Sequence, residues 1–482
     1  MSAGATAPDL TTGPIGKTLL MFTLPTLASN ILQSLNGSIN AIWVGRFIGE
    51  NGLAATASAN IIMFLLLSLM FGIGMAATVA IGQATGARDI DAVRRTFGSA
   101  VGFSVIIAIV VAGIGWIAAP RILYWLSTPA GAYPLALAYL RIIFISMPFG
   151  LIAVMITMCL RGAGDAITPL KFMILTAILD AGLNPLLILG VGPFPRWGIA
   201  GSAAATAIAS IVTLVALIIY LYRADLPLRL RGPELRYLRP APEQVRLLMT
   251  KGVPMGLQMI IMSAAGIIMV GLVNREGLLT AAAYSASQQL WTYVQMPAIA
   301  VGAGVSAMAA QNIGAGKWER VDAITRNGLM LSFLITSTLI GVLLLFDRPA
   351  LGLFLGMDSP AIAIARRMQL IASWSFLLFG LAMVFISVMR ANGVVVAPLI
   401  ILLFALLPVR LGFYEALYPA VGVDALWMAF PVGAAAVLVL AAALYRHGGW
   451  RTVRPMAPPT KEECIEAAQA EADPAGRMSP TG

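Results

Sequence analysis

The chain has 482 residues, of which 59% are hydrophobic and only 11% are charged, and its mean hydropathy is +0.89. Soluble domains carry about 25% charged residues, so this chain has too little polar surface to form a water-soluble globule. The net charge of +10 comes from short segments between apolar runs, which is typical of a membrane protein and argues against nucleic acid as a partner.

Twelve apolar runs follow one another along the chain, each long enough to cross a hydrocarbon core of about 30 Å. In the first half they span residues 15–45, 54–84, 97–124, 135–160, 169–191 and 198–223. In the second half they span residues 247–273, 280–311, 326–346, 361–389, 397–419 and 422–446. We therefore predict an all-α integral membrane protein with twelve transmembrane helices in the lipid bilayer.

The segments outside the runs predict the orientation of the chain. Residues 1–14 form a polar N-terminal tail, residues 224–246 a basic loop between the sixth and seventh runs, and residues 447–482 a C-terminal tail. Lys and Arg are concentrated on the side of the bilayer that holds these three segments, and such segments stay in the cytoplasm. We expect a multi-pass protein of a bacterial or archaeal inner membrane with both termini cytoplasmic.

The first run contains Pro25 and a stripe of amide side chains. Asn30, Gln33, Asn36 and Asn40 recur at spacings of three or four residues, which places them on one face of a helix. A single Asn in a membrane helix often serves only as a hydrogen-bonded contact between helices, whereas four amides on one stripe favour a polar site. Pro25 is either a tolerated kink or a hinge, and the run supports both interpretations.

The fifth run contains Asp180, the only acid that we place deep within an apolar run, and Asn184 follows it by one helical turn. A carboxylate inside the bilayer is costly, so its presence indicates either a functional site or a hydrogen-bonded helix contact. Carboxylate, amide and hydroxyl oxygens are the ligands of hard cations. We predict a site for H⁺ or Na⁺ with the following residues: Asp180, Asn184, Asn40, Asn36 and Thr206. A bound Na⁺ would contact Asp180, Asn40 and Asn184.

The seventh and eighth runs carry Met and aromatic side chains that are suited to an adaptable cavity. Six residues are expected to line a substrate cavity: Asn30, Gln33, Gln258, Met262, Tyr284 and Trp291. Ordinary helix packing is the alternative for each of them. Because the face of the seventh run that corresponds to the amide stripe is almost wholly apolar, we expect the polar site in the N-terminal half only.

The two halves of the chain repeat one another. Pro25 matches Pro254 at an offset of 229 residues, and Arg161 matches Arg390 at the same offset. Six runs in each half give both copies the same orientation, which is the plan of transporters built from parallel repeats. We expect residues 15–223 (the N-lobe) and 247–446 (the C-lobe) to form two six-helix bundles around a central cavity.

Several motifs, in this order, resemble those of the multidrug and toxic compound extrusion (MATE) family. They are V-G-R-x-x-G at 44–49, Q-x-x-G-A at 83–87 and 311–315, L-R-G-x-G-D-x-x-x-P at 160–169, N-P-L-L-I at 184–188 and G-I-A-G-x-A-x-A-T at 198–206. The resemblance covers residues 15–446. It implies an antiporter that expels amphipathic, often cationic, organic compounds in exchange for H⁺ or Na⁺ by alternating access, with bending of the first helix at Pro25.

Within the family, the chain resembles the DinF-like and archaeal type more than the NorM-like type. The first type places an Asp at the position of Asn40, and Asn and Asp where this chain has Asp180 and Asn184. One acid is therefore missing here and the other is displaced by one helical turn, which implies a single negative charge at the site. The NorM-like type places acids in the seventh and tenth runs, where residues 261–263 and 377–381 hold none.

Two other functions fit these residues less well. A flippase for a lipid-linked saccharide, from the wider superfamily, would need a cationic cavity, and Arg410 is almost the only basic residue inside the runs. A membrane-embedded enzyme would need a catalytic constellation, and neither the single His nor the acids provide one. We expect a monomeric, non-enzymatic exporter of small organic molecules that needs no cofactor besides its coupling ion.

Overall fold

The computed structural model describes residues 9–125, 128–190, 196–453 and 456, apart from the side chains of residues 57, 58 and 61, and it contains no strand within these ranges. The helices of the first half are α1 (Ile15–Ile48), α2 (Glu50–Gly86), α3 (Ile90–Trp125), α4 (Tyr133–Gly162), α5 (Ile167–Leu189) and α6 (Ile199–Arg223). A short 3₁₀ helix, η1 (Gly232–Leu238), follows in the connecting loop.

The helices of the second half begin with α7 (Pro242–Arg275), α8 (Leu278–Gly314), α9 (Trp318–Leu345), α10 (Asp347–Leu355), α11 (Ala361–Ala372) and α12 (Trp374–Ala391). Then come α13 (Val396–Phe404), a π-helical turn η2 (Ala405–Val409), α14 (Arg410–Val421), α15 (Asp424–His447) and a 3₁₀ turn η3 (Gly449–Thr452). Helix α7 begins ahead of residue 247, where the sequence predicted the start of the C-lobe.

Twelve segments of the described chain are long and apolar enough to cross a membrane, one for each predicted run. Helices α11 and α12 together make the tenth segment, and α13, η2 and α14 make the eleventh. Some helices begin before their apolar run: α3 begins at Ile90 and α9 at Trp318. Each carries an acid in its first turn, Asp91 or Glu319, which stabilises the positive end of the helix dipole.

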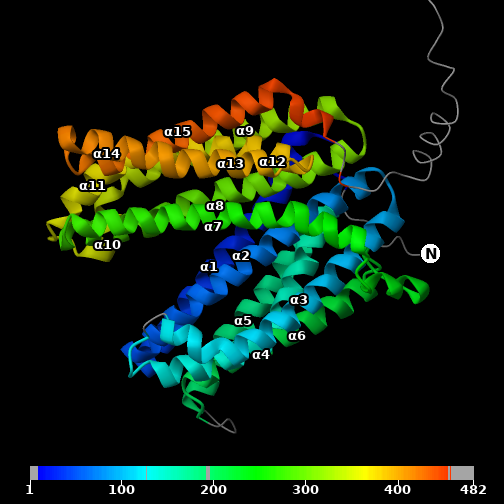
Figure 1. Cartoon of the computed structure of the whole chain (residues 1–482), viewed down its shortest axis with the longest axis horizontal. Coiled ribbons are helices and arrows are strands. Elements are labelled where there is room, and N and C mark those ends of the chain that lie inside the picture. The colour runs from blue at the N-terminus through cyan, green and yellow to red at the C-terminus, as the bar shows by residue number, and fades with distance from the viewer. Residues whose placement is uncertain (1–8, 126–127, 191–195, 454–455, 457–482) are drawn as a thin grey trace, which may run out of the picture.

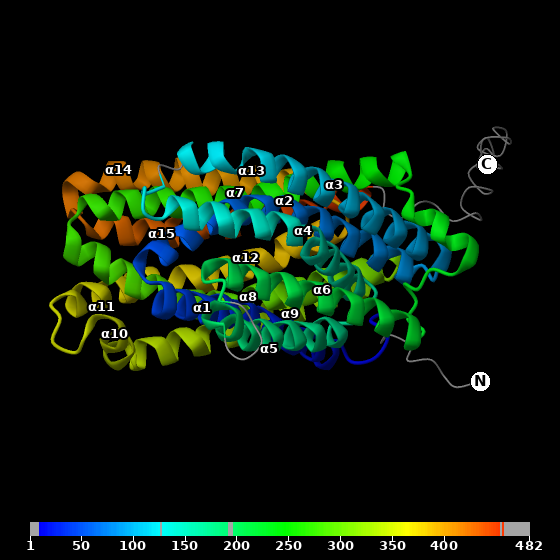
Figure 2. The same cartoon turned by 90° about the horizontal axis from the view of Figure 1, so that it is seen from below.

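The helices form two lobes, α1–α6 and α7–α15, as the repeat predicted (Figure 1). The lobes converge at the end of the molecule where α1 begins and α15 ends, and they diverge toward α10, α11 and α14 (Figure 1). After a rotation by 90°, the helices of both lobes run along a common long axis (Figure 2). The two lobes therefore lie close together at the end where α1 begins and α15 ends, which we call the closed end, and farther apart at the other end, which we call the open end (Figure 1).

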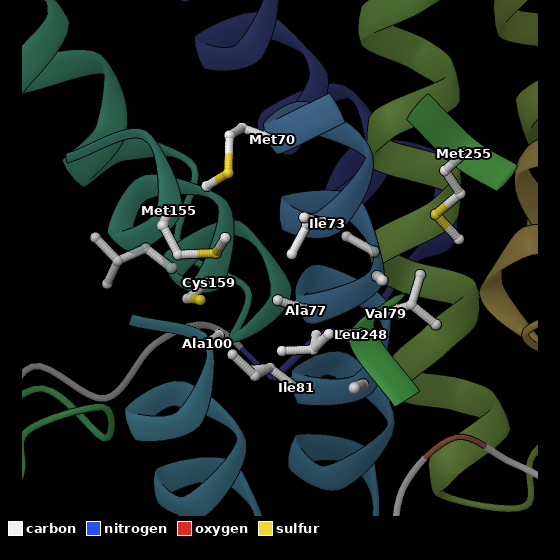
Figure 3. Close-up of a cluster of buried hydrophobic side chains, with 14 of the residues drawn as sticks. Met70, Ile73, Ala77, Val79, Ile81, Ala100, Met155, Cys159, Leu248 and Met255 are labelled. Atoms are coloured by element: carbon white, nitrogen blue, oxygen red, sulfur yellow. The ribbon is translucent and has the colours of Figure 1, made fainter. Parts of the chain in front are cut away.

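The core at the closed end is built around α2. Its residues Ile73 and Ala77 pack between Met155 of α4, in the same lobe, and Leu248 and Met255 of α7, in the other lobe (Figure 3). All five side chains are almost fully buried. Apolar packing between the lobes therefore joins the two repeats at this end.

Glycines let the two lobes approach closely at the closed end. A Cβ atom on Gly86 would lie 1.8 Å from the carbonyl oxygen of Gln311, and one on Gly314 would lie 1.9 Å from that of Gln83. The two contacts are reciprocal, because each pairs the Gly of one Q-x-x-G-A motif with the Gln of the other. The duplicated motif therefore marks the place where α2 and α8 meet.

Candidate functional site

Asp180 lies in the middle of α5, with only 2% of its surface exposed. Its carboxylate accepts three hydrogen bonds: Asn36 Nδ2 donates to Oδ2 at 2.9 Å, Thr206 Oγ1 to Oδ1 at 2.9 Å, and Asn184 Nδ2 to Oδ1 at 3.2 Å. The donors belong to α1, α6 and α5, so three helices of the N-lobe meet at this carboxylate. Among the ion pairs of the described residues, none involves Asp180.

Two amide oxygens beside this carboxylate have no hydrogen-bond partner in the described part of the chain, namely Asn36 Oδ1 and Asn184 Oδ1, and both are buried. Each amide donates its N–H group to Asp180 and leaves its carbonyl oxygen without a donor. A buried acceptor without a partner costs about 1–3 kcal/mol. A carboxylate with two such oxygens nearby is the type of donor set that a hard monovalent cation binds.

Asn40, also predicted for this site, does not contact Asp180 directly. Its Oδ1 accepts a hydrogen bond from Ser202 Oγ at 2.7 Å, and Tyr139 of α4 is buried in the N-lobe. Ser202 lies one turn before Thr206 on α6, so Asn40 supports the neighbours of the carboxylate and not the carboxylate itself. Tyr139 and Ser202 were not predicted, although a Tyr inside the fourth apolar run was a visible signal.

The amide stripe of α1 serves two different places. Asn36 and Asn40 face the Asp180 cluster, as the hydrogen bonds above show, whereas Asn30 lines a cavity between the lobes. Gln33 is exposed. Pro25 lies inside α1, which continues through it as one helix, and its carbonyl oxygen accepts a hydrogen bond from Ser29 Oγ at 2.9 Å.

The central cavity is lined by α1, α2 and α4 of the N-lobe and by α7, α8, α12 and α13 of the C-lobe. Its empty space is about 1070 Å³, including the part that is open to solvent. Six methionines from both lobes line it: Met75, Met158, Met255, Met259, Met262 and Met383. Because Met is unbranched and polarizable, such a wall adapts to ligands of different shape.

Two arginines, Arg161 and Arg390, also line this cavity. Arg390 is only 7% exposed, and its Nη2 donates to Gln258 Oε1 at 3.0 Å. The Nε atoms of both arginines are buried without a partner in the described chain. The sequence placed them at the ends of runs and did not predict them as site residues, although their matched positions in the two repeats were visible.

Of the six residues predicted to line the cavity, Asn30, Gln258 and Met262 do so. Tyr284 and Trp291 instead pack inside the C-lobe, with ring centroids 6.0 Å apart and an edge-to-face arrangement. Gln33 is not among the residues that line the cavity. Hydropathy could not separate these cases, because an aromatic residue in a membrane helix has the same pattern whether it faces a cavity or a neighbouring helix.

The C-lobe also buries polar side chains, apart from the polar site that the sequence predicted in the N-terminal half. Besides Arg390 and Gln258, the C-lobe buries Arg410, whose guanidinium carbon lies 3.7 Å from the centroid of the Phe430 ring. Arg410 Nε and Nη2 are buried and have no hydrogen-bond partner among the described residues. The C-lobe therefore buries a positively charged side chain, as the N-lobe buries the acidic side chain of Asp180.

The sequence matches the MatE family model over residues 25–186 and over residues 254–413. The first match runs from Pro25 in α1 to α5, and the second from Pro254 in α7 to α14. One match lies in each lobe, in agreement with the internal repeat. The matched residues include Asp180 and both cavity arginines.

Known proteins resemble the chain over nearly its whole length. The chain is 36% identical over 434 residues to the Probable multidrug resistance protein YoeA of Bacillus subtilis (strain 168), and this alignment covers 90% of the chain and 94% of YoeA. YpnP, another probable multidrug resistance protein of the same organism, is 27% identical over 456 residues, 93% and 98% of the two chains. An outward-facing multidrug resistance MATE family transporter of the MOP superfamily shares the fold, with a TM-score of 0.84, 19% identity and coverage of 93% and 98%.

Proposed function

The chain belongs to the MATE family of multidrug transporters, and from this we propose that it is a secondary antiporter that exports amphipathic organic compounds in exchange for H⁺ or Na⁺. The observation that carries the proposal is the carboxylate of Asp180, buried among donors from three helices beside two unpartnered amide oxygens. The proposed substrate site is the separate cavity between the lobes.

Helix α1 physically connects the two sites. Asn36 on α1 donates to Asp180, and Asn30, six residues earlier on the same helix, lines the cavity. The first half of α1 also packs against the other lobe, where Thr23 lies close to Gly304 of α8. A change in the occupancy of the Asp180 cluster therefore acts on a helix that touches the cavity and both lobes.

The substrate is exchanged for the cation if the two ligands favour different positions of α1. Each ligand shifts the equilibrium between shapes only by its difference in affinity for them. We place the end with the termini in the cytoplasm of a bacterial or archaeal cell, because the basic loops lie there. The open end of this structure would then face outward, and Pro25 would be the hinge of α1.

The same cluster supports the DinF-like assignment, since the acid lies in α5 of the N-lobe. Between the two coupling ions, the unpartnered oxygens of Asn36 and Asn184 favour Na⁺, because a proton on Asp180 provides one O–H donor, which can satisfy only one of the two oxygens. The Na⁺ would contact these two oxygens and the carboxylate, whereas Asn40, which is hydrogen-bonded to Ser202, would not contact it.

The test is efflux from proteoliposomes that contain the full chain, loaded with an amphipathic dye and given either a Na⁺ gradient or a pH gradient. A Na⁺ gradient should drive concentrative efflux, and collapsing it with an ionophore should stop it. Efflux that depends on the pH gradient alone would assign H⁺ as the coupling ion. Efflux that needs neither gradient would contradict the antiport mechanism.

A flippase for a lipid-linked saccharide is a second candidate because of one observation. The apolar runs of the sequence contain almost no basic residues, which argued against a flippase. Arg161 and Arg390, which lie at helix ends in the sequence, nevertheless line the central cavity. The positive charge that such a substrate requires is therefore present.

A further inference from the structure

We propose that the central cavity binds its substrate through an anionic oxygen group, such as a carboxylate, sulfonate or phosphate, held by Arg161 and Arg390. The exported compounds would then be amphipathic anions, and not the cations that the family resemblance implied. The inference rests on the proposed function and adds the charge of the substrate to it.

The two guanidinium groups retain unused hydrogen-bond donors. A guanidinium has five N–H donors, arranged to bind planar oxyanions in a bidentate manner. Arg390 donates one bond to Gln258 and has one weak contact, 3.8 Å from Nη1 to Met75 Sδ, while its Nε has no partner among the described residues. Arg161 Nε is likewise buried without a partner. An oxyanion would supply the missing acceptors.

The described residues provide no counter-charge for the two arginines. In the described part of the chain neither Arg161 nor Arg390 forms an ion pair. Among the lining residues that the structure describes there is no Asp or Glu. A buried charge without a partner is unfavourable. A cationic substrate would add a like charge to this cavity, whereas an anion would neutralise it.

The two arginines lie next to residues that join the lobes at the closed end. Arg161 precedes Gly162 on α4, and Arg390 precedes Ala391 on α12. The carbonyl oxygens of Gly162 and Ala391 accept hydrogen bonds from Gln311 and Gln83, which join the lobes at the closed end. An anion held by both arginines would therefore contact both lobes at the floor of the cavity, while the six methionines surround the apolar part of the molecule.

The alternative is a structural role. Each arginine is the second-last residue of its helix, where a positive charge stabilises the carbonyl end of the helix dipole. That role accounts for a basic residue at each helix end and makes no distinction between substrates. Charge selectivity of ligand binding is therefore the measurement that separates the two roles.

The experiment compares two dyes with the same xanthene core, anionic fluorescein and cationic tetramethylrhodamine methyl ester, at neutral pH. Binding to the purified full chain is measured by fluorescence anisotropy. The parent protein should bind fluorescein more tightly. Arg161→Gln and Arg390→Gln should each weaken fluorescein binding by about 10-fold or more, the factor expected when hydrogen bonds to a charged group are lost, and should leave the cationic dye unaffected or better bound.

Two control sets accompany these variants. Arg161→Lys and Arg390→Lys, which keep the charge, should retain part of the affinity for fluorescein. Arg121→Gln removes an exposed arginine of α3 that does not line the cavity, and it should change neither affinity. Thermal unfolding of each variant verifies that it is folded. If a Gln variant does not fold, the Lys variants, which keep the charge, still test the role of the two side chains.

Tighter binding of the cationic dye by the parent, no binding of fluorescein, or equal effects of the Gln variants on both dyes would overturn the inference. Arginine-dependent binding without gradient-driven efflux of either dye would uphold the anion site and contradict the proposed antiport.

A fluorescent lipid phosphate tests whether the anion is a lipid headgroup or a free organic anion. Arginine-dependent movement of this lipid between leaflets, without efflux of fluorescein, would show that the site binds a lipid headgroup. Efflux of fluorescein would show that it binds a free organic anion.

Discussion

At the residue level, every polar neighbour within hydrogen-bond distance of the Asp180 carboxylate donates to it. Asn36, Asn184 and Thr206 supply these donors, and none of them contributes a formal charge. The cluster therefore stabilises a negative charge inside the N-lobe without neutralising it. In the proposed mechanism, a cation that enters the cluster would supply the missing charge, so a single acid would be sufficient for coupling.

Asp180→Asn should abolish gradient-driven efflux, because the amide carries no charge to exchange. The variant should remain folded, with a loss of about 1–2 kcal/mol, since the amide nitrogen cannot accept a hydrogen bond that the carboxylate accepted. Dye efflux from proteoliposomes and thermal unfolding measure the two effects. Uphill efflux equal to that of the parent would move the coupling site away from Asp180.

The four amides of α1 should differ in their contribution to coupling. Asn36→Ala should weaken ion-driven efflux more than Asn40→Ala, because Asn36 contacts the carboxylate and Asn40 contacts Ser202. Gln33→Ala is the matched control, since this side chain is exposed on the same helix. The measurement is the Na⁺ concentration that gives half-maximal efflux, and an equal shift for all three variants would show that the cluster is not the site of coupling.

At the element level, the glutamines of the duplicated Q-x-x-G-A motifs join the lobes symmetrically, α2 to α12 and α8 to α4. Gln83 Nε2 donates to Ala391 O at 2.7 Å, and Gln311 Nε2 donates to Gly162 O at 3.1 Å. The terminal segments contact the same side chains: Leu10 N donates to Gln311 Oε1, and Met456 N donates to Gln83 Oε1. The ends of the chain therefore contribute to the closed end of the molecule.

Gln83→Ala and Gln311→Ala should favour opening at this end. Each buried hydrogen bond contributes about 1 kcal/mol, so each substitution should shift the equilibrium between shapes about fivefold. Spin labels at the exposed Arg88 and Glu319 would report the separation of the lobes as a distance distribution. The control is Gln288→Ala, an exposed residue of α8, and identical distributions for the control and the two variants would contradict the closure.

The π-helical turn η2 shows how the repeat diverged. Ahead of it, Pro169 and Pro398 match at an offset of 229 residues, and the π-helical turn lies between α13 and α14, whereas α5 of the N-lobe is a continuous α-helix. Arg410 directly follows this turn, and Asp180 lies within α5.

At the level of the whole molecule, the closed end holds the basic connecting loop, and the open end holds the segment between α10 and α11 (Figure 1). Arg231 lies in the connecting loop at the closed end, and Asp358 lies between α10 and α11 at the open end (Figure 1). Single cysteines at these positions should react with an impermeant reagent from opposite sides, with Arg231 accessible from the cytoplasm. Labelling of both from the outside would contradict the predicted orientation.

The charge of the substrate determines how efflux responds to the membrane potential. Export of a monovalent anion in exchange for one monovalent cation moves two charges, and each contributes about 2.3 kcal/mol per 100 mV. Exchange of a monovalent cation for another is electroneutral. Fluorescein efflux should therefore accelerate when a potassium gradient and valinomycin make the vesicle interior negative, and a rate that is independent of potential would contradict anion export.

The sequence by itself determined the class of protein, the number of membrane spans, the internal repeat and the acid at the centre of the N-lobe. These follow from hydropathy, spacing and charge, which are properties of contiguous residues. Only the tertiary structure decided that Asn40 supports the cluster indirectly and that Tyr284 and Trp291 lie inside the C-lobe. It also brought Arg161 and Arg390, 229 residues apart, to one cavity. The physical reason is that the side of a helix that faces a cavity depends on how the two lobes pack against each other, and hydropathy does not record that contact.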